Sequence, residues 1–400
     1  MKLMRNQIRP YPWGSRTALA DLLGEPSPAP TPQAELWIGA HPSASSVLGE
    51  DPDQSLAKVI TLDPVGTVGP NAQAAFGARL PFLLKVLAAD EPLSLQAHPC
   101  TEHARSGFAR EEAAGIPLSA PDRNYRDGSH KPELICALTD FHAMCGFRDP
   151  TSTLRLLAEL SVPEIDEYVA VLYHQPDAEG LRALFEALVS LPPEALTPLL
   201  DAVVSACTVR ASTGSPFAAE YRTAQHLADR YPADAGVLVS LLLNRITLHP
   251  GQALFLPAGN LHAYLSGVGV EITANSDNVL RGGLTSKHVD VTVLMAVVDF
   301  TPGDVPILTG SPTWAGEVTY PTQVLEFQLS QMDLDGQVRD ITHPGPQVLL
   351  TVDGYITATD NTGQAIPLVR GQTLWIPSAD RDVRITGIGR VFRATDGMAA

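Results

Sequence analysis

The sequence predicts a mainly β protein whose strands are interrupted by one helical segment. Two observations support this fold class. Short apolar runs alternate with turn residues across residues 37–146, which is typical of strands in a barrel or sandwich. Across residues 149–240 the apolar positions change to helical spacing, as at Leu154, Leu157 and Leu160. A β structure that resumes after this helical segment is therefore expected.

The elements before the helical segment can be predicted in chain order. Residues 17–23, TALADLL, suit a short helix, and the proline-rich loop EPSPAPTPQ that follows can hold neither a helix nor a central strand. The strand candidates that come next are LWIGA, SSVLG, PFLLKVL, LSLQAHP and PELICAL. Together they predict one side of a barrel.

The helical segment has a recognisable start and end. Asp149 and Ser152 flank Pro150 and offer caps where it begins. Strand character returns in ITLHPGQALFLPAG, near residue 245. We therefore expect a first domain made of residues 1–149 and 245–310, a helical insertion over 150–244, and a C-terminal domain over 311–400.

The last hundred residues repeat part of the earlier pattern. Gly371 to Pro377, GQTLWIP, has the layout of Gly251 to Pro257, GQALFLP. Five residues further on, Asp382 stands where the first copy has His262. The repeat predicts a second barrel that lacks the histidine and binds no metal.

Composition narrows the function classes. The chain has 400 residues, 44% of them hydrophobic and 18% charged, as expected for a globular protein with two or three domains. It contains no 18-residue apolar run and no apolar signal region at its start, so we expect no membrane span and a cytoplasmic location. The net charge of −17 argues against nucleic acid as a partner. The four cysteines lack metal-type spacing and predict reduced thiols. We expect a monomer, with a dimer as the alternative.

Three short segments place metal-ligand side chains at useful spacing. In GQALFLPAGNLHAY a strand and a Pro-x-Gly bend precede His262. Gln96 and His98 stand two residues apart, as do Lys131 and Glu133, and side chains at that spacing share one face of a strand. A polar pair satisfied by the backbone is the alternative. Two imidazoles, a carboxylate and an amide oxygen suit zinc without excluding other divalent metals.

These segments resemble known families. The spacing of Gly251, Pro257, Gly259 and His262 resembles the second metal-binding motif of the cupin superfamily. The wider set resembles the type I mannose-6-phosphate isomerases over residues 1 to about 300: PYPWGS, AELWIGAHPS, PFLLKVLAADEPLSLQAHP, GSHKPELICAL, CGF, LPAGNLHAYLSGVGVEI and ANSDNVLRGGLTSK. The resemblance implies two jelly-roll barrels of the cupin type, the first catalytic and the second degenerate. It also implies one zinc ion per chain, bound by the residues that match the family's ligands, namely Gln96, His98, Glu133 and His262.

The reaction implied by the resemblance interconverts mannose 6-phosphate and fructose 6-phosphate. A proton moves between two carbons through an enediol, which requires a base and a stabilised oxyanion. The resemblance assigns Arg281 as the active-site arginine, and its glycine neighbours predict that it lies at the mouth of a flexible turn. The other site candidates are Lys131, Glu271 and Tyr264 for acid/base work, Lys287, Ser94 and Lys85 for phosphate, and Trp13 for a wall of the sugar pocket.

One departure and two alternative functions complete the prediction. After QAHP the family continues with an acidic or amide residue and a lysine, whereas this chain has Cys100 and Thr101, so the loop up to Gly128 is expected to differ in length or mobility.

An iron-dependent cupin oxygenase could use His98, Glu133 and His262 as a facial triad. A non-catalytic sugar-binding cupin is the second alternative. The fourth ligand and the cluster of arginine and lysine residues argue against the oxygenase.

Overall fold

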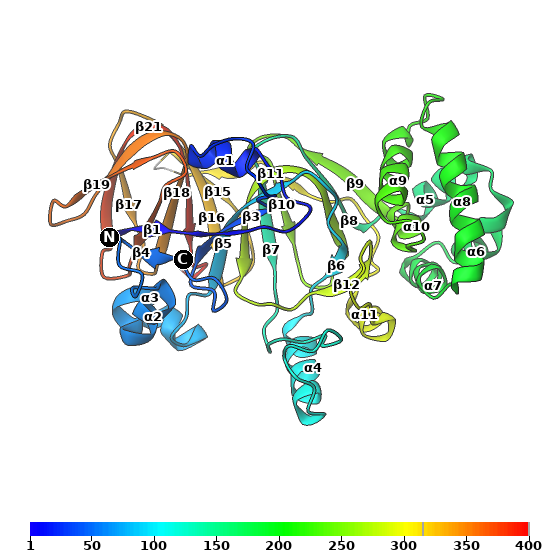
Figure 1. Ribbon diagram of the computed structural model, residues 1–400, viewed down its shortest axis with the longest axis horizontal. Coiled ribbons are helices and arrows are strands. Elements are labelled where there is room, and N and C mark those ends of the chain that lie inside the picture. Colours follow the sequence, from blue (N-terminus) through cyan, green and yellow to red (C-terminus); the bar gives the residue numbers. More distant parts are fainter. Residues whose placement is uncertain (314–315, 399–400) are drawn as a thin grey trace.

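The computed structural model describes residues 1–313 and 316–398, and two large sheets form its centre (Figure 1). One sheet has eleven strands and the other has ten. A bundle of helices lies at one end of the long axis, and the sheet that contains the last strands lies at the other end. The prediction of a mainly β protein with a helical segment is confirmed.

The eleven-stranded sheet is organised around β11, which pairs with β5 and β7 along one half and with β6 and β8 along the other. The predicted strand before the Pro-x-Gly bend is β10, so that prediction is confirmed. The strands of this sheet are β2 (Gln7–Arg9), β3 (Glu35–Gly39), β5 (Phe82–Ala89), β6 (Leu95–Ala97), β7 (Glu133–Ala137), β8 (Phe141–Phe147), β9 (Leu243–Leu248), β10 (Ala253–Leu256), β11 (His262–Ala274), β12 (Leu280–Gly283) and β13 (Ile307–Leu308).

The ten-stranded sheet contains the last strands of the chain and also the first one. Strand β1 pairs with β20 along three residue pairs, so the N-terminal strand is part of the C-terminal sheet. Apolar residues of both sheets, among them Phe82, Val270, Trp375 and Phe392, belong to one buried cluster. The strands are β1 (Lys2–Arg5), β4 (Val47–Leu48), β14 (Ser311–Pro312), β15 (Glu317–Tyr320), β16 (Gln328–Asp335), β17 (Arg339–Thr342), β18 (Gln347–Thr359), β19 (Ala365–Val369), β20 (Thr373–Ile376) and β21 (Asp382–Thr395).

The sequence repeat corresponds to a structural repeat. Gly251 and Gly371 adopt positive φ angles of 86° and 83°, and each lies in the turn before a four-residue strand. The long strands that follow begin at His262 and Asp382. The two segments therefore share a local path and differ in the residue at its functional end.

The helical bundle occupies residues 150–240. Its first helix is capped by Asp149, whose side chain accepts a hydrogen bond from the N–H of Ser152 at 2.9 Å, as the sequence predicted. Leucines on the predicted apolar faces, such as Leu157 and Leu184, are buried. The helices are α5 (Pro150–Leu160), α6 (Pro163–His174), α7 (Ala178–Val189), α8 (Pro193–Arg210), α9 (Ala218–Arg230) and α10 (Gly236–Ser240).

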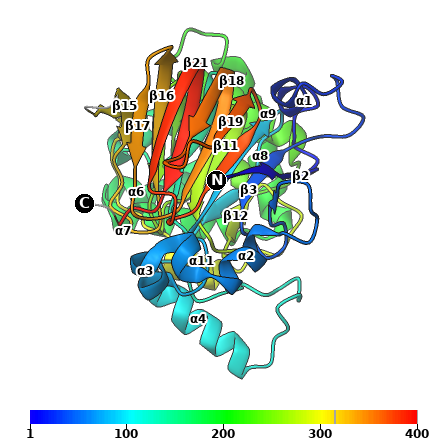
Figure 2. The same cartoon turned by 90° about the vertical axis from the view of Figure 1, so that its left-hand side faces the viewer.

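Helices also interrupt the region where only strands and loops were expected, and this part of the prediction was wrong. The short predicted helix exists as α1 (Ala18–Leu23), but α2 (Leu56–Leu62), α3 (Pro64–Phe76) and α4 (Thr101–Ala113) were missed, as was α11 (Val291–Val297). Helix α4 projects from the body of the molecule (Figure 2). Its buried residues are Ala104, Gly107 and Glu111. Such small or charged residues leave no apolar stripe in the sequence.

Two further findings concern membrane spans and thiols. Within the described residues no single helix is both long and apolar enough to cross a membrane, although α7 and α8, bent by 110° at their break, together reach that length and composition. All four cysteines are free thiols, in agreement with the prediction.

Candidate metal centre and active site

Strand pairing brings the predicted site residues together. At the start of β11, His262 lies opposite Gln96 of β6, and Gln96 lies opposite Arg281 of β12. Directly opposed residues on neighbouring strands have their side chains within contact range. Three residues that are far apart in the chain therefore form one row across the sheet.

The Pro-x-Gly bend connects the two histidine motifs. Gly259 adopts a positive φ of 82°, and its N–H donates to the backbone oxygen of His98 at 2.8 Å. A side chain at this position would meet the backbone oxygen of Val297 at 3.0 Å. The bend thus favours glycine for its conformation as well as for space. It places the imidazole rings of His98 and His262 5.2 Å apart between centroids.

His98, Glu133 and His262 form a buried cluster of metal-type ligands. Nε2 of His98 lies 3.2 Å from Oε1 of Glu133, and Nε2 of His262 lies 3.5 Å from Oε2. One potential ligand atom from each residue lies within 4.8 Å of the other two, and all three residues are buried. Among residues 1–313 and 316–398, no other group of three or more His, Cys, Asp or Glu residues meets this criterion.

The hydrogen bonds of the two imidazoles define what the cluster can bind. Nδ1 of His98 contacts the backbone oxygen of Asn278 at 2.7 Å, and Nδ1 of His262 contacts that of Asn260 at 3.0 Å. A carbonyl oxygen only accepts, so in each neutral ring Nδ1 carries the proton and Nε2 presents its lone pair. Both lone pairs face the carboxylate of Glu133. Such an arrangement of acceptors suits a cation.

Burial and charge keep these ligands in their metal-binding forms. Burial lowers the pKa of His98 to about 4, despite the opposing effect of Glu133. Burial alone would raise the pKa of Glu133, but the neighbouring cation Lys131 leads the effects that outweigh burial and hold that pKa well below its usual range. The imidazole of His98 is therefore neutral and the carboxylate ionised near pH 7. The donor set fits a divalent metal such as zinc.

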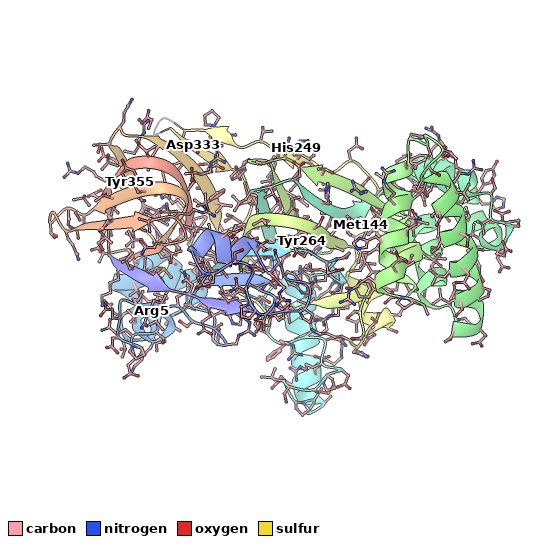
Figure 3. The ribbon with its side chains drawn as sticks, turned by 45° about the horizontal axis from the view of Figure 1, so that its top comes forward. Arg5, Met144, His249, Tyr264, Asp333 and Tyr355 are labelled. Carbon is pink, nitrogen blue, oxygen red and sulfur yellow. The ribbon has the colours of Figure 1, made fainter. Side chains whose placement is uncertain are left out.

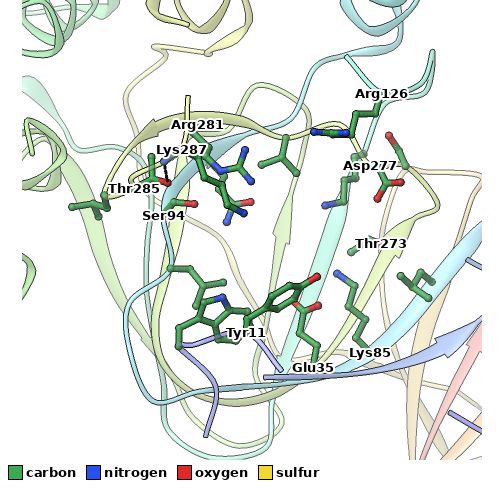
Figure 4. Close-up of a pocket in the computed structure, with 18 of the residues that line it drawn as sticks. Tyr11, Glu35, Lys85, Ser94, Arg126, Thr273, Asp277, Arg281, Thr285 and Lys287 are labelled. Atoms are coloured by element: carbon green, nitrogen blue, oxygen red, sulfur yellow. Dashed lines mark hydrogen bonds between the residues drawn. The ribbon is translucent and has the colours of Figure 1, made fainter. Parts of the chain in front are cut away.

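A pocket of about 600 Å³ adjoins the cluster (Figure 4). Lys131 connects the two, because it lines the pocket and its Nζ lies 2.9 Å from Oε1 of Glu133. Seven of the predicted site residues line this pocket: Trp13, Lys85, Ser94, Gln96, Lys131, Arg281 and Lys287. Gln96 thus faces a cavity next to the histidine cluster.

Comparisons with known proteins identify the family. A model of the phosphomannose isomerase type I catalytic domain matches residues 1–150. The mannose-6-phosphate isomerase of Escherichia coli (strain K12) is 39% identical over 396 residues, which cover 98% of this chain and 99% of that protein. The chain belongs to the type I phosphomannose isomerase family.

Solved structures agree with this assignment along the whole chain. A crystal structure of a phosphomannose isomerase mutant from Salmonella typhimurium matches with a TM-score of 0.91 and 37% identity, covering 99% of both chains. A zinc-bound holo structure of mannose 6-phosphate isomerase matches with a TM-score of 0.89 and 36% identity, again covering 99% of both chains. The family relationship thus includes the last hundred residues, where the sequence motifs were weakest.

In this phosphomannose isomerase family member, Arg281 lies on a strand. It belongs to β12, which pairs with β6, so the prediction of a flexible turn was wrong. The two glycines that suggested a turn allow close packing instead, because a side chain at Gly283 would meet the backbone of Gly236 at 2.9 Å. Arg281 is half-buried on the pocket wall. Strand pairing therefore fixes the backbone that carries its guanidinium group.

Lys85, Glu271 and Tyr264 form a buried chain of hydrogen bonds. Lys85 on β5 lies opposite Glu271 on β11, and its Nζ donates to Oε2 at 2.8 Å. The hydroxyl of Tyr264 donates to Oε1 at 3.0 Å. Burial alone would lower the pKa of Lys85, but Glu271, Glu35 and Glu133 outweigh it and raise that pKa above its usual value. Lys85 is therefore a fixed cation at the pocket wall.

Glu271 and Tyr264 lie behind this lysine and do not line the pocket. Figure 3 shows Tyr264 in the middle of the molecule. Burial raises the pKa of Tyr264 well above its usual value, and the charge of Glu271 raises it further. Tyr264 is thus a neutral hydrogen-bond donor. An acid/base role for these two residues stays a prediction.

Tyr264→Phe should destabilise the protein by about 1–3 kcal/mol, because it leaves a buried carboxylate oxygen without its donor. Urea unfolding of the metal-loaded variant measures this change, and Tyr173→Phe is the control, since Tyr173 is 73% exposed. If Tyr264 acts only through Glu271, kcat is largely retained. A fall of about 100-fold or more in kcat would instead mark an acid/base catalyst.

Several pocket residues were missed by reasoning from the sequence. They are Tyr11, Glu35, Trp37, His41, Arg126 and Asp277. The N–H of Ser43 donates to Nδ1 of His41, so Nε2 carries the proton, and this atom lies 3.2 Å from Oδ1 of Asp277. The contact with His41 lowers the pKa of Asp277. Burial acts in the opposite direction, but nearby cations lower the pKa further, so it lies below its usual value. The motif AELWIGAHPS contained the signal for three of these residues but did not show which of them face the pocket.

Proposed function

We propose that this protein is a zinc-dependent isomerase that interconverts mannose 6-phosphate and fructose 6-phosphate. The main support is the likeness along the full chain to mannose-6-phosphate isomerases. The site agrees with it chemically, because two imidazole lone pairs and a carboxylate converge beside a pocket that has several cationic side chains. The iron oxygenase and the non-catalytic sugar-binding cupin are not favoured by the family relationship.

The proposed zinc ligands are His98, Glu133 and His262, with the amide oxygen of Gln96 as the fourth. One ion per chain is expected. When bound, zinc would act as a Lewis acid that stabilises negative charge on the sugar oxygens. The set has one formal negative charge against a divalent ion, which leaves the site net positive and suited to that task.

The remaining roles follow from position on the pocket wall. Arg281 is proposed to stabilise the oxygen that becomes negative in the enediol, because its half-buried guanidinium lines the pocket next to Gln96 in strand register. Lys131, which lines the pocket and contacts Glu133, is the acid/base candidate nearest to the metal ligands. Lys287 and Ser94 are proposed to contact the phosphate. Lys85 and Trp13 would contact the sugar from the facing wall.

The architecture also extends the proposal. We propose that the two sheets form cupin-type jelly-roll barrels, the first catalytic over residues 1–149 and 245–310 and the second over 311–400, except that the strands β1 and β4 of the N-terminal region pair within the second sheet. Residues 150–244 are then a helical insertion. A metal-free second barrel is expected because Asp382 replaces the histidine. We propose a cytoplasmic monomer.

Metal removal tests the proposed function directly. A coupled assay should detect conversion of mannose 6-phosphate to fructose 6-phosphate, a chelator should abolish it, and added zinc should restore it. Metal analysis should find one zinc ion per chain. Absence of conversion by the zinc-loaded protein would refute the proposal. A second ion in the C-terminal sheet would refute the metal-free barrel.

A further inference from the structure

Three cationic side chains from distant parts of the chain meet on the pocket wall. Arg281 and Lys287 follow β11, whereas Arg126 belongs to the segment of residues 101–130 that contains α4, here called the α4 lobe. Figure 4 shows the three side chains on one side of the pocket, with Lys85 and Glu35 on the other. In the part of the chain that the structure describes, none of the three forms an ion pair within 4.0 Å.

The charge of Arg126 acts on the other two cations. The pKa of Arg281 is lowered by burial and then by Arg126. The pKa of Lys287 is lowered by burial, then by Arg281 and Arg126. Asp277 is the acid on this wall, and its carboxylate is already paired with the imidazole of His41. The wall therefore has an excess of positive charge that favours an anion.

The backbone of Arg126 is held in place by a buried side chain. Oδ1 of Asn278 accepts the N–H of Arg126 at 2.7 Å, and its Nδ2 donates to the backbone oxygens of Asp127 and Ser129 at 2.8 and 2.9 Å. Asn278 is fully buried, and its own backbone oxygen contacts Nδ1 of His98. The α4 lobe is thus fixed relative to the metal ligands.

The guanidinium group of Arg126 retains donors for a ligand. One nitrogen, Nη1, donates to the backbone oxygen of Leu118 at 2.6 Å. No protein acceptor lies within hydrogen-bonding geometry of Nε or Nη2 among residues 1–313 and 316–398. Arginine can bind phosphate oxygens with two parallel N–H groups. Arg126 is therefore oriented and equipped to bind an anion in the pocket.

We propose that Arg126 binds the phosphate group of the substrate from the α4 lobe, together with Lys287 and Ser94, while the neighbouring Arg281 keeps its proposed role at the enediol oxygen. This inference rests on the proposed function and adds to it a phosphate contact outside the set predicted from sequence. A phosphate dianion offers enough oxygens for contacts with more than one cation. The role is substrate positioning, so it should appear in KM and leave the chemical step intact.

The test compares Arg126→Gln and Arg126→Lys with Arg110→Gln. Arg110 lies on α4, is exposed and does not line the pocket, so its variant removes the same charge from the same lobe. KM and kcat for mannose 6-phosphate, the inhibition constant of inorganic phosphate and the zinc content are measured for each protein. Loss of one charge-assisted contact should raise KM and the inhibition constant of phosphate by about tenfold in Arg126→Gln.

Arg126→Lys should recover part of this loss, and kcat and zinc content should match the wild type. The inference is overturned if Arg126→Gln behaves like Arg110→Gln, or if kcat and zinc content fall together without a change in the phosphate constant. A wild-type protein without isomerase activity would contradict the proposed function instead. In that case direct titration with inorganic phosphate still decides the role of Arg126, since binding equal in wild type and Arg126→Gln overturns it.

Discussion

His262→Ala should lose the bound zinc and reduce isomerase activity by about a thousandfold or more, since metal stabilisation of a developing charge contributes several kcal/mol. His262 supplies one of only two imidazole lone pairs in the buried cluster, and Ala offers no ligand in its place. Gln96, His98 and Glu133 would remain, but three protein ligands hold zinc less firmly than the full set of four. Metal analysis and the coupled assay measure both losses.

Circular dichroism should show that the helical bundle of His262→Ala remains folded. The leucines that form the core of the bundle belong to a buried cluster that does not include His262. His249→Ala is the matched control. His249 is exposed on the surface (Figure 3) and pairs with Asp140 at 2.8 Å, away from the pocket. If His262→Ala keeps a near-normal zinc content and a near-normal rate, the proposed metal centre is refuted.

Arg281→Ala should retain zinc but lower kcat by about 100- to 1000-fold, the effect expected when one preorganised charge-stabilising donor is removed. The residue lies on a paired strand, so truncation of its side chain leaves the backbone and the neighbouring Gln96 in register. Single-turnover assays and metal analysis on the same sample separate chemistry from metal loss. Arg281→Lys should restore part of the rate, because it keeps the charge but loses the planar group.

Arg230→Ala serves as the comparison for this variant. Arg230 also lines the pocket, but it is exposed and lies 3.6 Å from the carboxylate of Glu91, so its charge is already partly compensated. Its loss should have a small effect on kcat. An Arg281→Ala protein with the same kcat as Arg230→Ala would exclude the proposed catalytic role.

Local sequence patterns predicted those parts of the site that lie within one short segment. The strand β10, the Pro-x-Gly bend and the start of β11 at His262 all follow from residue types at fixed spacing. The pair formed by Gln96 and His98 was predicted only in part, because β6 contains Gln96 but ends at Ala97, so that His98 lies just beyond the strand. Period-two alternation and turn chemistry act over a few residues, so they are readable without knowledge of the fold.

Contacts between distant segments could not be predicted in this way. The pair formed by Lys85 and Glu271 joins residues 186 positions apart, and it depends on the register of β5 against β11. The hydrogen bond from His98 to the backbone of Asn278 depends equally on tertiary structure. Arg281 was misplaced in a turn because a strand as short as β12 contains too few residues to show alternation. Packing, rather than local preference, determines such elements.

The pairing of β1 with β20 has a consequence for dissection of the protein. A fragment that ends near residue 310 would lack β20, so the backbone groups of residues 2–4 would lose their partners and Met4 would lose its apolar surroundings. The buried cluster shared by Phe82 and Phe392 would be cut at the same time. The two ends of the polypeptide are therefore expected to unfold as a cooperative unit, and exchange of the C-terminal half between homologues would require exchange of the first strand with it.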